Sequence, residues 1–332
     1  MMVALALSAG FAALLWTSID SARVATLIAR ATLAPIGLAL LVYALDFFLR
    51  ALRFWLLLDP RRDSGRPLAP TVAPFVASFG VSDILPFRLG DVFRLCWFCN
   101  RLGWPAGLVI GAMLVERLLD LLAILVIAAA AVWAVQASVP AALARNLVIL
   151  LAAGGLAILV VLLAPRANCQ VCARLERSIA PAWVRRLCAV ARSVAQGLRM
   201  LGGVGHLSVM LLLSIALWLL ESLVMLGAWV SLGGHASDWL KPLVAFAFST
   251  LGTLFPALPG HFGTYDAAGA LSFYAIGVPV EQAAATILLA HLLLWLPTVL
   301  FAIGWFLLAR HTSAEPEPHP EQGLVSGASA PA

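Results

Sequence analysis

Charged side chains inside apolar segments are the residues of this sequence most able to do chemistry. Glu116, Arg117 and Asp120 lie about eleven residues into an apolar run that begins near Pro105. A helix rises ~1.5 Å per residue, so in a membrane-spanning helix these groups would lie ~16 Å deep, near the middle of a ~30 Å hydrocarbon core. Glu116 and Asp120, four residues apart, share one face. We expect this face to hold a cation or protons, or else to form a structural ion-pair network.

The cation for this acidic pair must come from another segment, because Arg117 points away from the shared face. Arg88 and Arg94, in a short apolar segment that precedes the run, are the candidates. Because a planar guanidinium binds two oxygens at once, both also suit a phosphate.

A second apolar run carries Asp46, Arg50 and Arg53 on one face, at spacings of four and seven residues. We expect Asp46 to pair with Arg50. We expect Arg53, near the end of the run, to extend its guanidinium to the membrane surface. In later runs, we expect Glu221 to face the interior of the helix bundle and His291 to be a hydrogen-bonded core residue rather than a ligand.

Two short segments begin with residues typical of helix N-termini, Gly90-Asp91 and Thr264-Tyr265-Asp266. Asp91 and Thr264 are the expected caps. Free N–H groups and the positive end of the helix dipole suit phosphate at such a terminus, and Arg88 lies beside one of them. Simple capping is the alternative role for Asp91 and Asp266.

Metal and cofactor chemistry has little support in the sequence. Cys96-x2-Cys99 and Cys169-x2-Cys172 have the spacing of zinc ligands, but aromatic residues between the first pair favour ordinary packing, so we interpret these cysteines as small buried side chains. The sequence contains no Walker A, GxSxG or HExxH motif. We predict no metal, no cofactor and no catalytic residue.

The composition defines the elements that position these residues. Of the 332 residues, 63% are hydrophobic and 11% are charged, and the mean hydropathy is +1.00. Ordinary globular domains contain about 25% charged residues. A soluble protein of this size cannot bury so much apolar surface. Soluble enzymes, disordered proteins and nucleic-acid-binding proteins are therefore excluded, and the fold class is an all-α polytopic membrane protein.

The apolar runs predict about six full spans. They cover residues 3–19, 33–58, 105–135, 147–164, 207–232 and 282–309. Residues 20–32 predict a short surface helix. Two further pairs of short segments, 70–85 with 92–101 and 242–258 with 264–276, are too short to cross comfortably. We assign residues 1–310 to one transmembrane domain and residues 311–332 to a disordered cytoplasmic tail.

Arginine-rich loops indicate the orientation. Loops 59–69 and 166–199 are the most basic, and the positive-inside rule places both in the cytoplasm. They reach the same side only if each short pair enters and leaves on one side, which predicts two re-entrant hairpins.

The two short pairs also resemble each other. Phe75…Gly80…Leu85-Pro86…Gly90 recurs as Phe246…Gly252…Leu258-Pro259…Gly263. Because one copy follows a span that enters the cytoplasm and the other a span that leaves it, we predict an inverted repeat. Such repeats are typical of transporters, with the site at the repeat interface. Chance recurrence in an apolar chain rich in Gly and Pro is the alternative.

These residues resemble a known family. Leu85-Pro86-x-Arg88-x-Gly90-Asp91-x-x-Arg94, Glu116-Arg117-x-x-Asp120 and Pro259-Gly260-x-x-Gly263-x-x-Asp266 are similar to the signature of the lysylphosphatidylglycerol synthase transmembrane-domain family, over roughly residues 5–309. That family's domain is the flippase-like part of the bacterial multiple peptide resistance factor. We expect no aminoacyl-transferase domain here, so the resemblance implies lipid translocation or lipid handling in the bacterial inner membrane.

Four positions depart from the family pattern. The family usually has Glu at positions 91 and 266 and Gly at 261, and often Arg at 291, where this chain has Asp91, Asp266, His261 and His291. The shorter carboxylates and the two histidines put the identity of the substrate in question.

Together these features predict an inner-membrane lipid flippase or transporter that binds polar-lipid headgroups at a midplane site. The predicted substrate-binding residues are Arg88, Asp91, Arg94, Glu116, Arg117, Asp120, Pro259, Gly260, Gly263 and Asp266, with Arg50, Arg53, Glu221 and His291 in secondary roles. The arginines would hold phosphate, and the carboxylates would meet a cationic headgroup or coupling protons. The alternative is a membrane-embedded enzyme or non-catalytic subunit of a lipid, glycolipid or hopanoid synthesis pathway. Lipid-synthesis enzymes are candidate partners; nucleic acid is not.

Overall fold

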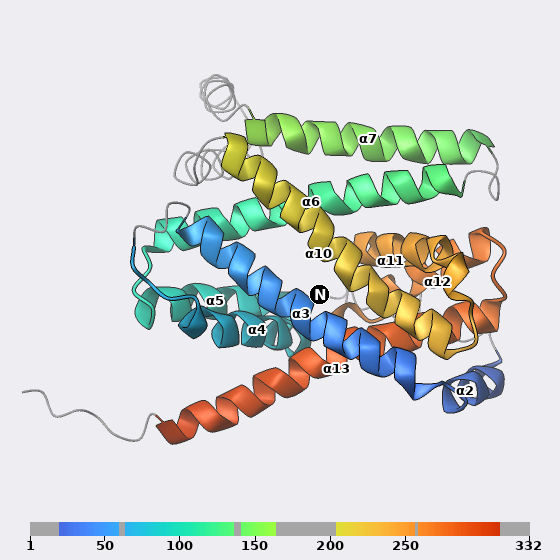
Figure 1. The fold of residues 1–332 in the computed structure, drawn as a ribbon, viewed down its shortest axis with the longest axis horizontal. Coiled ribbons are helices and arrows are strands. Elements are labelled where there is room, and N and C mark those ends of the chain that lie inside the picture. Colours follow the sequence, from blue (N-terminus) through green and yellow to red (C-terminus); the bar gives the residue numbers. More distant parts are fainter. Residues whose placement is uncertain (1–19, 60–63, 136–140, 164–203, 256–257, 313–332) are drawn as a thin grey trace, which may run out of the picture.

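The computed structural model describes residues 20–59, 64–135, 141–163, 204–255 and 258–312. The predicted first span, Arg61 and Arg62, the basic loop 166–199 with its cysteine pair, and the tail beyond Thr312 lie outside the described residues. Within the described ranges the regular elements are α-helices and short 3-10 turns. The predicted all-α class is therefore confirmed for this part of the chain (Figure 1).

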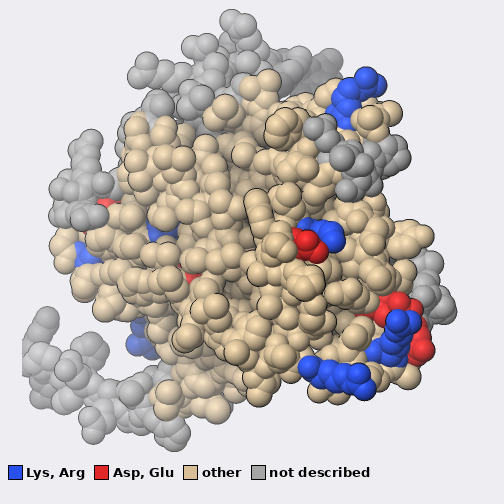
Figure 2. All heavy atoms as spheres, turned by 45° about the vertical axis from the view of Figure 1, so that its right-hand side comes forward, with Lys and Arg blue, Asp and Glu red and all other residues tan. Residues whose placement is uncertain are grey.

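The predicted apolar runs within these ranges become long helices. These are α3 (Leu33–Leu58), α6 (Ala106–Ala134), α7 (Ala141–Leu163), α10 (Val204–Ser231) and α13 (Val280–Thr312). Three segments in the described part are long and apolar enough to cross a membrane, namely Leu33–Leu58, Gly205–Ser231 and Val280–Leu308. Helix α6 has a similar length but carries three charged residues near its middle. The surface in Figure 2 is largely uncharged, as expected of a protein surrounded by lipid.

The predicted surface helix is α2 (Ser21–Ala29), a nine-residue helix that precedes α3. Asp20 caps it, because its Oδ1 accepts hydrogen bonds from the backbone N–H groups of Ala22 at 3.0 Å and Arg23 at 3.2 Å. Most of its side chains are exposed.

Helices α3 and α10 pack against each other in antiparallel directions. The backbone N–H of Thr32, just before α3, donates to the carbonyl of Ser231 at the end of α10, at 2.9 Å. The segments that follow these two helices therefore begin at opposite ends of the pair. Helix α6 packs against α10 and α7.

Each of those following segments forms a helical hairpin. The first consists of α4 (Ala69–Ile84), the turn Pro86–Arg88 and α5 (Leu89–Asn100). The second consists of α11 (Leu240–Gly252), the turn Pro259–His261 and α12 (Thr264–Ala275). They lie toward opposite ends of the molecule in Figure 1. Helix α13 packs against α4 and α12, and the second turn touches α4.

Glycine allows the close approach of the helices in each hairpin. A Cβ on Gly90 would lie 1.8 Å from the Ser78 carbonyl oxygen, and a Cβ on Gly252 would lie 2.6 Å from the Thr264 carbonyl oxygen. Any larger residue would push α5 away from α4 or α11 away from α12.

The two turns share an uncommon backbone conformation. Phe87 and Arg88 have φ of 60° and 52°, and Gly260 and His261 have φ of 70° and 60°. Each turn thus has two successive left-handed residues directly after its proline. Three of the four are not glycine, and such strained residues concentrate at functional sites.

Candidate functional site

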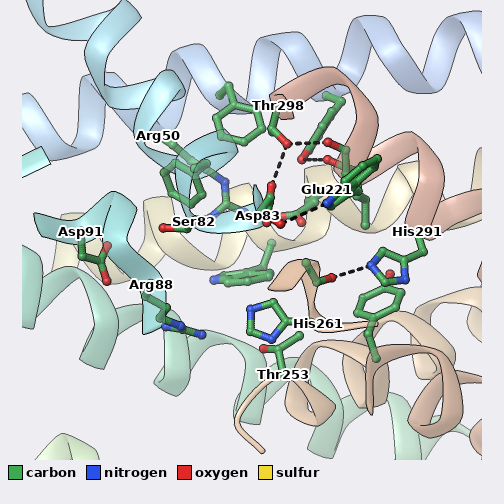
Figure 3. Close-up of a pocket in the computed structure, with 18 of the residues that line it drawn as sticks. Arg50, Ser82, Asp83, Arg88, Asp91, Glu221, Thr253, His261, His291 and Thr298 are labelled. Atoms are coloured by element: carbon green, nitrogen blue, oxygen red, sulfur yellow. Dashed lines mark hydrogen bonds and ion pairs between the residues drawn. The ribbon is translucent and has the colours of Figure 1, made fainter. Parts of the chain in front are cut away.

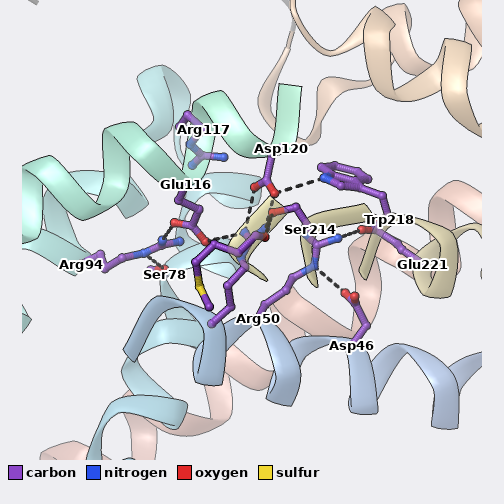
Figure 4. A network of polar contacts seen from close by, with 12 residues as sticks. Asp46, Arg50, Ser78, Arg94, Glu116, Arg117, Asp120, Ser214, Trp218 and Glu221 are labelled. Atoms are coloured by element: carbon purple, nitrogen blue, oxygen red, sulfur yellow. Dashed lines mark hydrogen bonds and ion pairs between the residues drawn. The ribbon is translucent and has the colours of Figure 1, made fainter. Parts of the chain in front are cut away.

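The acidic pair of α6, Glu116 and Asp120, lies in a buried ion-pair network (Figure 4). Its central cation is Arg53 of α3. The Arg53 guanidinium contacts Asp120 at 2.5 and 3.0 Å, Glu116 at 3.1 Å and the Ser214 hydroxyl at 2.6 Å. Glu116 and Asp120 are 2% and 8% exposed, and Arg53 is fully buried. One planar group therefore bridges both carboxylates, and it balances one of their two negative charges. The expected extension of Arg53 to the membrane surface is wrong, because these carboxylates hold its charge in the interior.

Arg94 of α5 is the cation that the first hairpin supplies to this network. Its Nη1 lies 2.8 Å from Glu116 Oε2, and its Nε donates to the Ser78 hydroxyl at 2.9 Å. The rings of Phe54, Phe75 and Phe79 surround its guanidinium at 4.3–5.2 Å. Of the two candidates from this hairpin, Arg94 and not Arg88 contacts the acidic pair, and it reaches Glu116 alone.

A second cluster adjoins the first. Arg50 pairs with Asp46 at 2.6 Å, as predicted, and also with Glu221 of α10. Glu221 thus faces the interior as expected. The Trp218 ring links the two clusters, since it lies 4.6 Å from the Arg50 guanidinium and its Nε1 donates to Asp120 at 3.2 Å. The network ties α3, α6 and α10 together.

The first hairpin turn does not use Asp91 as a cap. Helix α5 begins at Leu89 with Arg88 at the N-cap position and no side-chain cap. Asp91 instead accepts from Arg117 at 2.9 Å, in a pair whose side chains are 28% and 40% exposed. Asp91 is the third residue of α5, in its first turn, and its carboxylate pairs with an arginine of the neighbouring α6.

At the second turn Gly263, not Thr264, is the N-cap residue of α12. Asp266 Oδ2 accepts from the Gly263 backbone N–H at 2.9 Å, as the capping alternative expected. The other oxygen, Oδ1, lies 2.7 Å from His291 Nδ1, and His291 Nε2 lies 2.8 Å from the Gly260 carbonyl oxygen.

His291 is a buried, hydrogen-bonded residue, as predicted. Because the Gly260 carbonyl can only accept, Nε2 carries a proton. The contact between His291 Nδ1 and Asp266 then requires a second proton, held by one of the two side chains. The pair joins α12, the second turn and α13.

A cavity of about 180 Å³ lies between the two hairpin turns (Figure 3). Of the predicted residues, the cavity is lined by Arg50, Arg88, Asp91, Arg94, Arg117, Glu221, Gly260 and His291. The lining does not include Arg53, Glu116, Asp120, Pro259, Gly263 or Asp266. Three of these residues bind lining residues: Glu116 binds Arg94, Asp120 binds Trp218 and Asp266 binds His291.

Arg88 differs from the other arginines of the cavity. Arg50, Arg94 and Arg117 each pair with a carboxylate, whereas Arg88 has no ion pair with any residue that the structure describes. Its left-handed backbone places it at the tip of the first turn. Arg88 is therefore the cation most available to an anionic ligand.

Sequence reasoning missed several lining residues, above all Asp83, and it named His261 only as a departure from the family pattern. Asp83 Oδ2 accepts from the Thr298 hydroxyl at 2.7 Å, and the Asp83 carbonyl accepts from Trp295 Nε1 at 3.4 Å. The signal for Asp83 was present, because a carboxylate in an apolar segment is expensive unless it serves a site.

No group of three potential metal ligands occurs among the described residues. The expectation of buried cysteines is wrong for the described pair, since Cys96 is exposed and Cys99 is half-buried. Cys96 faces outward from α5, whereas Cys99 packs partly against the hydrophobic cluster that contains Phe98.

The fold and the site define a class: a helical membrane protein whose charged residues gather around a cavity between two hairpin turns. The chain belongs to the lysylphosphatidylglycerol synthase TM region family, whose model matches residues 1–302. This confirms the resemblance found in the sequence and indicates a membrane protein with a lipid-related function. No match was found among curated proteins or among solved structures.

Proposed function

We propose that the protein is a flippase-like lipid transporter of the bacterial inner membrane that binds a phosphate-containing lipid headgroup in the cavity between the hairpin turns. The observation that carries this proposal is Arg88, a cavity-lining arginine without an ion pair among the described residues, beside Arg117 and the N-terminus of α5. A phosphate there would meet a guanidinium without an ion pair and the N-terminus of a helix that no side chain caps.

Arg117 is the second proposed phosphate ligand. Its pair with Asp91 is 40% exposed on the arginine side, so the guanidinium can be shared with a ligand. Arg94, whose Nη1 and Nε bind Glu116 and Ser78, positions the hairpin instead. The deeper carboxylates Glu116 and Asp120 are neutralised by arginine, and we assign them a role in holding the cavity walls.

The proposed topology has six spans and two re-entrant hairpins in an inverted repeat. Support comes from the antiparallel packing of α3 on α10, after which each hairpin begins at an opposite end. The paired left-handed residues after Pro86 and Pro259 give the two turns matching geometry. In this topology loop 166–199 and the C-terminal tail are cytoplasmic.

Cysteine accessibility tests the topology in intact cells and inverted vesicles. Single cysteines replacing Arg62 and Arg177 should react with a membrane-impermeant thiol reagent only in inverted vesicles. A cysteine replacing His235 should react in intact cells. Labelling of positions 62 and 177 from opposite sides would overturn the proposed topology.

Transport is tested with the purified protein reconstituted into vesicles that contain fluorescent phosphatidylglycerol, phosphatidylethanolamine or phosphatidylcholine. Reduction of outer-leaflet fluorophore by dithionite measures lipid flipping. We expect faster flipping of at least one phospholipid than in protein-free vesicles. If no lipid is flipped, while deletion of the gene changes the products of lipid synthesis, the alternative role in a synthesis pathway replaces this proposal.

A further inference from the structure

An apolar groove of about 800 Å³ lies between α3, α4 and α13, next to the charged cavity. No charged residue lines it, and all its lining side chains are hydrocarbon except those of Tyr43 and Thr298. Leu40, Phe48 and Leu300 on its rim are exposed, so the groove opens to the surroundings of the protein. Ala44 and Ala73 leave space within it.

The groove and the cavity adjoin each other. Tyr43, Phe47 and Thr298 line both of them. The two hydroxyl-bearing side chains of the groove are therefore at its junction with the cavity. There the Thr298 hydroxyl donates to Asp83 at 2.7 Å, and the Tyr43 hydroxyl donates to the Leu294 carbonyl at 2.7 Å. Across this junction the lining changes from ionic groups to hydrocarbon.

A glycerophospholipid changes polarity in the same way, from a charged phosphate through the glycerol esters to hydrocarbon. We propose that the groove binds an acyl chain of a phospholipid whose phosphate lies in the cavity beside Arg88. This inference rests on the proposed function, because the cavity must hold the headgroup. An acyl chain fits better than a protein helix, since a lipid also carries a phosphate that can pair with Arg88 in the adjoining cavity.

Photo-crosslinking tests the inference without requiring transport. The full-length protein is reconstituted in phosphatidylcholine vesicles with a trace of phosphatidylglycerol that carries a diazirine in one acyl chain. Mass spectrometry then compares labelling of groove peptides from α3 and α4 with labelling of the exposed face of α6 around Ala130. Diacylglycerol with the same photoreactive chain is the probe without phosphate. Ala73→Phe fills the groove, and Ala130→Phe is the matched control on an exposed helix face.

We expect severalfold more phosphatidylglycerol labelling in the groove than on the α6 face. Ala73→Phe should remove most of the excess, Ala130→Phe should retain it, and Arg88→Gln should reduce it for phosphatidylglycerol but not for diacylglycerol. Equal labelling of the groove and the α6 face would mean annular lipid only and would overturn the inference. So would an excess of groove labelling that survives both Ala73→Phe and Arg88→Gln. A groove covered by a partner or a second copy would stay unlabelled, with the same consequence.

Different results would contradict the groove proposal and the flippase proposal. Phosphate-dependent labelling without lipid flipping contradicts the flippase proposal and leaves the groove assigned. Lipid flipping with an unlabelled groove contradicts the groove and leaves the flippase proposal standing.

Discussion

Replacing Arg53 with Met should destabilise the protein more than any other single loss of charge in the network. Arg53 is fully buried and contacts both Glu116 and Asp120, the latter through two hydrogen bonds. Its loss leaves Glu116 paired with Arg94, but leaves Asp120 with the Trp218 indole as its remaining polar contact among the described residues. Removing one partner of a buried ion pair costs about 3–5 kcal/mol of unfolding free energy.

The assay is unfolding by sodium dodecyl sulfate in mixed micelles, with thermal melting as a second readout. Arg53→Met combined with Asp120→Asn removes the unpaired charge, so we expect it to recover about half of the loss. The control, Arg30→Met at the exposed residue that follows α2, should change stability by about 0.5 kcal/mol or less. A loss in Arg53→Met no larger than in Arg30→Met, or strictly additive effects of the two network changes, would refute the reasoning.

Three further predictions concern the same framework, each measured as the melting temperature of the purified protein in detergent. Arg50→Met should destabilise the protein by about 3 kcal/mol and Glu221→Gln by about 1 kcal/mol. Arg50 pairs with two carboxylates, whereas Asp46 keeps Arg50 as its partner when Glu221 is neutralised; equal losses would contradict this. Gly90→Ala should destabilise by about 3 kcal/mol, because its Cβ meets the Ser78 carbonyl, whereas Gly107→Ala has open space and should cost nothing; an undisturbed Gly90→Ala protein would show that α4 and α5 do not pack this closely. His291→Leu should cost about 1–3 kcal/mol because it leaves Asp266 and the Gly260 carbonyl without their shared partner; an unchanged melting temperature would contradict the assignment of His291 as a link between α12 and α13.

The helices could be predicted from the sequence because apolar length alone determines most of them. The run predicted at 33–58 coincides with α3, and the run at 105–135 differs from α6 by one residue at each end. The predicted run at 147–164 starts six residues too late and ends one residue beyond α7 (Ala141–Leu163), because Arg145 and Asn146 lie near the start of this helix. Likewise α13 continues to Thr312, two residues into the predicted tail.

The pairing of charges could not be predicted in full. The i,i+4 pair of Asp46 and Arg50 follows from helix geometry, and it is present. The contact of Arg53 with Glu116 joins residues 63 positions apart and depends on how α3 crosses α6. Sequence spacing says nothing about that crossing, so Arg53 was judged by its distance from the helix end alone.

The hairpin turns, too, could be predicted only in part from the sequence. Proline and glycine predict the positions of the two turns. Helix α4 ends just before the first turn, but α11 ends at Gly252, well before the predicted end at residue 258. The capping role expected for Asp91 failed because the helix begins two residues earlier, at Leu89, after the left-handed residues Phe87 and Arg88. Non-glycine residues in this conformation are uncommon, and neither residue type signals it.

The central claim is that Arg88 binds the phosphate of a transported lipid, and the flipping rate of Arg88→Gln tests it most directly. The matched control is Arg101→Gln, an exposed arginine outside the cavity at the end of α5. With equal amounts of folded protein in vesicles, we expect Arg88→Gln to lose at least tenfold in the flipping rate and Arg88→Lys to recover little of it, because an ammonium lacks the planar fork. Arg101→Gln should flip lipid at the wild-type rate. Wild-type flipping in Arg88→Gln would contradict the account.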